Sequence, residues 1–101
     1  MTGTLGILVT SDLHLDYVIR LTETAFQKGK KIMIFFTGRA VKLIESTDFK
    51  RLKGKASIAV CDFSYRSLAL KDCMPDIEPG IFETQAKHAE IFKKCDRYVV
   101  F

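Results

Sequence analysis

The chain has 101 residues, of which 48% are hydrophobic and 28% are charged, and its formal net charge is +4. This length predicts a single domain over residues 1–101, and the composition is that of an ordinary globular protein. No apolar run reaches the ~18 residues of a membrane span, and the N-terminus lacks a signal-peptide pattern, so we expect a cytoplasmic protein.

Apolar patterning in the first third of the chain predicts a strand followed by a helix. Residues 4–10 form a continuous, β-rich apolar run, which is typical of a strand buried on both faces. Apolar residues then recur at spacings of three and four over residues 15–26, which predicts a helix with Phe26 on its inner face. Ser11 and Asp12 precede this helix as candidate caps, and Gly29 suits the left-handed position that ends it.

The middle of the chain repeats this alternation. We expect a second buried strand at residues 31–36, a turn at Thr37 and Gly38 with Thr37 capping a helix, and a helical turn within residues 48–53. A third buried strand spans residues 56–61 and ends at Cys61. The apolar residues expected to face inward from the helical segments are Ala40, Val41, Ile44, Phe49 and Leu52.

The last third is less regular. A short helix is expected at residues 64–70, with Tyr65, Leu68 and Ala69 offering apolar contacts, and a loop at 73–80, where two prolines and a glycine interrupt regular structure. Residues 81–82 form either a short fourth strand or the entry to a final helix. That helix is expected to carry Phe82, Ala86, Ala89 and Phe92 on one face, and a core strand at residues 97–101 follows it. The apolar residues left for a subunit interface are Ile77, Ile81 and Ile91.

Alternating strands and helices with short connections predict an α/β fold. The expected architecture is a three-layer α/β/α domain with a mainly parallel four- or five-stranded sheet, like a flavodoxin or Rossmann fold. Parallel strands place their carboxyl ends at one edge of the sheet, where ligands bind in such folds. The polar and reactive residues that follow the three strands are expected there: Ser11, Asp12, His14, Thr37, Gly38, Arg39, Cys61, Asp62 and Ser64.

Cys61 is the candidate nucleophile of this edge. A helix that starts just after it would direct backbone N–H groups and a positive dipole end toward the sulfur, and these favour the reactive thiolate. Cys73 is either a resolving thiol or incidental, and Cys95 is assigned to packing. The three cysteines lack CxxC spacing, which predicts neither a disulfide framework nor a zinc site.

Several familiar chemistries are absent from the sequence. It contains neither GxxxxGK[ST] nor a GxGxxG after a strand, and it has no metalloprotease helix motif. A receiver-like phosphoacceptor fails too, because Asp62 lies one residue beyond the strand end and no lysine follows the last strand. The lysines are scattered, densest at residues 28–31 and 50–55, and are not interleaved with aromatic residues, so we do not expect nucleic-acid binding.

Four segments together resemble the DsrE/DsrF-like family of small α/β sulfur-handling proteins, which includes TusD-type relay subunits. They are residues 5–26, 32–41 and 96–101 and, most specifically, Val60-Cys61-Asp62-Phe63-Ser64, which is similar to the "peroxiredoxin-like" DsrE branch. The resemblance implies a persulfide on Cys61, sulfur donor and acceptor proteins as partners, and a homo- or hetero-oligomer, often a trimer or hexamer. The family's glycine several residues after the cysteine is replaced here by Ala69 or is absent.

Two functions follow from these observations. In the first, the protein is a sulfur carrier or sulfurtransferase that needs no cofactor or metal, with His14, Arg39, Ser64 and backbone N–H groups supporting the Cys61 anion. In the second, it is a non-catalytic oligomeric module that binds a small anionic ligand or a partner at the same edge. An exposed, electropositive Cys61 sulfur would favour the first function, and a sealed apolar environment would favour the second.

Overall fold

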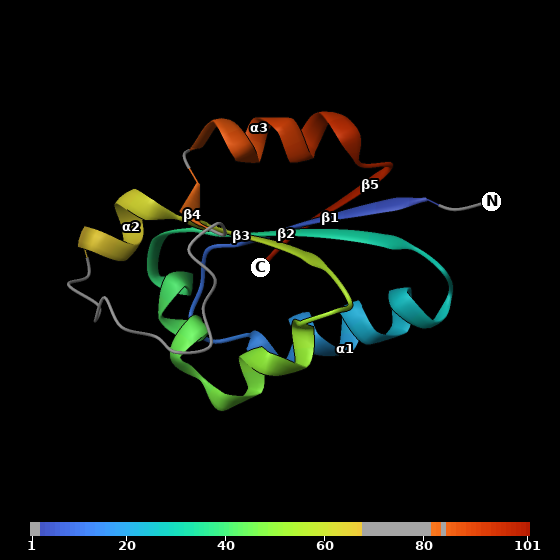
Figure 1. Cartoon of the computed structure of the whole chain (residues 1–101), viewed down its shortest axis with the longest axis horizontal. Coiled ribbons are helices and arrows are strands. Elements are labelled where there is room, and N and C mark those ends of the chain that lie inside the picture. Colours follow the sequence, from blue (N-terminus) through green and yellow to red (C-terminus); the bar gives the residue numbers. More distant parts are fainter. Residues whose placement is uncertain (1–2, 68–81, 84) are drawn as a thin grey trace.

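The computed structural model describes residues 3–67, 82–83 and 85–101. Its five-stranded sheet has the order β4-β3-β2-β1-β5, and every pair of neighbouring strands is parallel (Figure 1). The predictions of an α/β fold and a mainly parallel sheet are confirmed, and the described residues form five strands. The strands are β1 (Thr4–Val9), β2 (Lys31–Phe36), β3 (Ser57–Cys61), β4 (Phe82–Glu83) and β5 (Arg97–Val100).

The chain builds the sheet outward from β1. It adds β2, β3 and β4 on one side and then crosses back to place β5 on the other side of β1. Ile7 of β1 therefore lies between Ile34 of β2 and Val99 of β5 in the register. All the residues of β2 except Lys31 are buried, because helices lie on both faces of the sheet (Figure 1).

The two faces of the sheet carry different helices. On one face lie α1 (Leu15–Gln27) and two 3₁₀ helices, η1 (Gly38–Glu45) and η2 (Thr47–Leu52), and on the other lies α3 (Gln85–Lys94) (Figure 1). A short helix, α2 (Asp62–Ser67), begins directly after β3. Phe49 and Leu52 of η2 are buried as predicted. The Phe49 ring packs edge-on against the Phe36 ring, with 5.5 Å between the ring centroids.

In helix α1, most of the features predicted from the sequence are confirmed. Its buried residues are Leu15, Val18, Ile19, Thr22 and Ala25, and Gly29 takes the predicted left-handed conformation with φ of 76°. Phe26 is 48% exposed, contrary to prediction, because it lies about 100° round the helix from Ala25.

The predicted caps of α1 were wrong, whereas the N-cap position predicted for Thr37 is confirmed. The N-cap position of α1 is His14, without a side-chain cap hydrogen bond, because the helix begins only at Leu15. Ser11 instead accepts a hydrogen bond from the Leu13 N–H within the preceding turn. Thr37 holds the N-cap position of η1, but its side chain makes no capping hydrogen bond.

Burial in the C-terminal part also differs from expectation. Ile91, which we expected at a subunit interface, is 1% exposed and packs inward, whereas Phe92 is 60% exposed and stacks edge-on against Tyr98. Ala89 is exposed as well. Val100 is 57% exposed, because β5 is an edge strand paired only with β1. The short fourth strand is present as β4. The expected contacts of Leu68 and Ala69, the 73–80 loop, Ile77 and Ile81 lie outside the described residues.

An ion-pair cluster joins α1 to the segment around η2. The Glu23 carboxylate lies 3.1 Å from Lys55 Nζ and 3.2 Å from Arg51 Nη2. The hydrogen bond from Lys55 is the main cause that lowers the pKa of Glu23, assisted by Arg51 and opposed by desolvation. The attraction is therefore present at neutral pH and is lost as the pH falls through the lowered pKa, although solvent screens much of it.

Gly6 of β1 lets α3 approach the sheet closely. A Cβ at this position would lie 2.9 Å from Cys95 Sγ and 3.2 Å from Ile91 Cγ2. Real Cβ atoms essentially never come within 3.0 Å of another heavy atom. A side chain at residue 6 would therefore push α3 away from the strand.

No helix of the described part of the chain is long and apolar enough to cross a membrane.

We predict that Gly6→Ala lowers the free energy of unfolding by about 1–3 kcal/mol, because the new methyl group overpacks the contact with Ile91 and Cys95. Urea denaturation measures the change. Gly3→Ala is the matched control, since its Cβ would meet only flexible side-chain atoms of Asp96 and Lys30 at 3.4 Å or more. The control should change stability by less than about 0.5 kcal/mol. Equal stability of Gly6→Ala and wild type would contradict this packing.

Candidate functional site

The segments that follow β2 and β3 meet at the carboxyl edge of the sheet. Ser64 lies in α2, and its hydroxyl accepts a hydrogen bond of 3.0 Å from the Gly38 N–H. The same hydroxyl lies 3.4 Å from Thr37 Oγ1, and either atom can be the donor. Gly38 adopts a φ of 59°, a left-handed conformation that favours glycine. Residues 26 positions apart are thus joined at the edge where the sequence placed them.

The loop after β1 reaches the same region through an ion pair. Arg39 Nε lies 3.8 Å from Asp12 Oδ2, and the two side chains are 70% and 25% exposed. An ion pair this long and exposed contributes little to stability. The ion pair nevertheless leaves the Arg39 guanidinium exposed, so this group can bind an anion from solvent without a conformational change.

Two other predicted site residues have local partners. His14 precedes α1, and its ring makes a tilted contact with Tyr17 at 5.8 Å. Asp62, the first residue of α2, pairs with Arg66 one turn later, with 3.0 Å between Oδ2 and Nε. Neither of these two contacts involves Cys61.

Cys61 ends β3 as predicted, but its side chain is buried. It is 1% exposed and belongs to an apolar cluster on the α3 side of the sheet. The buried members of this cluster are Met33, Phe35, Ala59, Cys61 and Ile91. The Cys61 side chain therefore lies in a sealed apolar environment rather than an exposed one.

Cys61 and Cys95 are the two cysteines in the described part of the chain. Cys95 is half-buried, its thiol donates to the Phe92 carbonyl at 3.4 Å, and it packs beside Gly6. Neither Cys61 nor Cys95 forms a disulfide bond. Cys73 lies outside the described residues. Over the part of the chain that is described, no three His, Cys, Asp or Glu side chains gather as a metal site requires.

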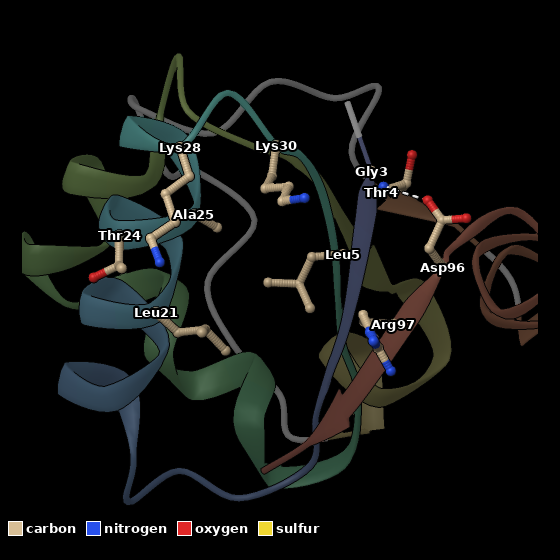
Figure 2. Close-up of a pocket in the computed structure, with 10 residues that line it drawn as sticks. All are labelled: Gly3, Thr4, Leu5, Leu21, Thr24, Ala25, Lys28, Lys30, Asp96 and Arg97. Atoms are coloured by element: carbon tan, nitrogen blue, oxygen red, sulfur yellow. Dashed lines mark hydrogen bonds between the residues drawn. The ribbon is translucent and has the colours of Figure 1, made fainter. Parts of the chain in front are cut away.

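The sequence did not reveal two features of the molecule. One is the hydrogen bond that fixes Gly38 to Ser64, for which the sequence carries no local signal. The other is a cavity of about 530 Å³ at the opposite, amino edge of the sheet (Figure 2). The only sequence signal near this cavity is the dense group of lysines at residues 28–31, two of which line it.

No protein-family model matches the chain, and no curated protein matches its sequence. The resemblance to the DsrE/DsrF-like family therefore rests on the motifs of the sequence alone.

We predict that Ser64→Ala lowers the free energy of unfolding by about 0.5–1.5 kcal/mol, because the Gly38 N–H loses its side-chain partner. Hydrogen exchange at the Gly38 amide should become faster in the same variant. Ser67→Ala, an exposed position at the end of α2, is the control and should change neither quantity. Unchanged exchange at Gly38 in Ser64→Ala would show that this contact does not hold the edge together.

Proposed function

We propose that the protein is a non-catalytic binding module whose site is the carboxyl edge of the sheet. The burial of Cys61 carries this proposal, because a thiol that is 1% exposed in an apolar cluster is out of reach of a second reactant. Polar groups meet at the same edge, where Ser64 bonds to Gly38 and Arg39 approaches Asp12. The edge thus offers groups for binding, while the candidate nucleophile Cys61 is enclosed.

The ligand class proposed for this edge is a small anion. Arg39 supplies the exposed cation, and a guanidinium group matches the geometry of phosphate and carboxylate oxygens through paired N–H donors. The net charge of +4 would further attract an anionic ligand. Asp12 holds the Nε side of Arg39 only weakly, so an incoming anion can compete for the guanidinium group.

Titration of the labelled protein with inorganic phosphate, followed by NMR, tests this site. We expect saturable shifts of the Gly38 and Arg39 amide signals. Arg39→Met should weaken binding about tenfold, the loss of one strong hydrogen bond to a charged group. Arg20→Met removes the same charge from an exposed position on α1 and should leave the affinity unchanged. Equal weakening by both variants, or no saturable shift, would contradict the proposal.

A second candidate function is the sulfur carrier implied by the family resemblance. It is favoured by the position of Cys61, the last residue of β3 with α2 beginning at the next residue. The Cys61 thiolate would attack the outer sulfur of a donor persulfide, forming Cys61-S-SH and releasing the donor thiolate. An acceptor thiolate would later attack that outer sulfur and restore the Cys61 thiolate. Both steps require the sulfur to become exposed.

Cysteine labelling separates the two functions. In a Cys73→Ser/Cys95→Ala protein, which keeps only Cys61, we expect a thiol reagent to react at least about a hundredfold more slowly in the folded than in the urea-unfolded state, because reaction needs local opening. Mass spectrometry after incubation with a persulfide donor should show no added sulfur on the folded protein. The same protein with Cys61→Ser is the control.

The opposite result would favour the sulfur carrier. A gain of about 32 Da on the folded single-cysteine protein, reversed by a thiol reductant and absent from the Cys61→Ser control, would contradict a purely non-catalytic role.

A further inference from the structure

A cavity of about 530 Å³ opens at the amino edge of the sheet, on the side of the molecule away from the carboxyl edge (Figure 2). It lies between the last turns of α1 and the first residues of β1 and β5. Its volume falls within the range of ~300–1,000 Å³ that is usual for small-molecule sites. It is a separate place from the proposed anion site at Arg39.

The topology of the sheet explains why the space exists. Helix α1 connects β1 to β2, whereas β5 lies on the other side of β1. The α1 face of the sheet is therefore left partly uncovered beside the first residues of β1 and β5. No described residue fills this space, and the cavity is the result.

The interior of the cavity is apolar. Leu5 of β1 and Leu21 of α1 point toward each other across it, and Ala25 lies one turn beyond Leu21 (Figure 2). Leu5 and Leu21 are partly buried and pack against the larger core cluster. An apolar group placed between them would extend that core and gain the free energy of burying apolar surface.

The border of the cavity is basic. Lys28 and Lys30 contribute from the end of α1 and the following turn, and Arg97 contributes from β5. Within the described chain none of these three cations forms an ion pair. Lys30 is folded back over the start of β1, since its Nζ lies 3.4 Å from where a Cβ on Gly3 would be.

The acidic residue of the lining, Asp96, already accepts a hydrogen bond from the backbone. Asp96 Oδ2 accepts a hydrogen bond of 2.7 Å from the Thr4 N–H, which fixes this carboxylate at the junction of β1 and the residue before β5 (Figure 2). Three cations thus face one carboxylate that has a backbone partner. This charge distribution favours an anionic group and disfavours a cationic one.

We propose that this cavity binds an amphipathic carboxylate with an unbranched aliphatic tail of medium length. The tail lies between Leu5, Leu21 and Ala25, and the carboxylate faces the border formed by Lys28, Lys30 and Arg97. A ligand without a negative charge would leave the three cations unused, and a small polar anion would leave the apolar interior uncovered. An amphipathic anion complements both parts of the cavity.

Titration of the labelled full chain with decanoate, followed by NMR, tests the proposal. We expect saturable shifts of the Leu5, Ala25 and Arg97 amide signals with decanoate, and much weaker effects on these three amides from acetate and from decyltrimethylammonium. Lys30→Met keeps the aliphatic stem but removes the charge, and it should weaken decanoate binding about two- to fivefold, the range of one partly exposed ion pair. Lys42→Met, an exposed position on η1, is the matched control and should bind decanoate as the wild type does.

Four results would overturn the proposal. They are the absence of saturable shifts with decanoate, equal affinity for decanoate and decyltrimethylammonium, equal weakening by Lys30→Met and Lys42→Met, and shifts of the cavity amides that depend on protein concentration alone. The last result would assign the cavity to contact with a second copy of the chain. The anion site at Arg39 can fail its own titration while this test succeeds, because the two titrations monitor different amides.

Discussion

The burial of β2 on both faces is the constraint on which the rest of the structure depends. Ile32 to Phe36 are all buried, which requires helices above and below the strand and neighbours on both sides of it. Parallel pairing with β1 and β3 then brings the ends of these three strands to the same edge. The segments that leave the strands must turn there, and the Gly38–Ser64 hydrogen bond and the Arg39–Asp12 ion pair are the result.

The same pairing decides how Cys61 is placed. Side chains alternate between the two faces of a strand, so Val60 joins the core on the α1 side and Cys61 joins the smaller cluster on the α3 side. Ile91 of α3 packs into that cluster, and Gly6 lets the helix come close enough to do so. Cys61, at the end of β3, is therefore enclosed within this apolar cluster. This enclosure is why binding, rather than thiol chemistry, is the function we propose first.

The two proposed sites lie at opposite ends of the sheet and differ in physical character. The carboxyl edge presents hydroxyl groups and an exposed guanidinium group, which suit a small, strongly hydrated anion. The amino edge combines an apolar interior with a basic border, which suits an anion that carries an aliphatic tail. The net charge of +4 favours anions at both sites, but only the apolar interior distinguishes between them. Binding at one site requires no contact with the other.

The sequence by itself determined the elements and their order, because periodic apolar residues and glycine report local conformation. The strands β1, β2 and β3, helix α1, the left-handed Gly29 and the buried Phe49 and Leu52 could all be predicted in this way. The tertiary structure alone decided exposure, since this depends on which elements become neighbours. Val100 is exposed because β5 lies at an edge, Ile91 rather than Phe92 faces the sheet, and Cys61 is buried in the apolar cluster that includes Ile91. The amino-edge cavity likewise forms only where residues from β1, α1 and β5 come together. No local sequence pattern predicts that these three elements are neighbours.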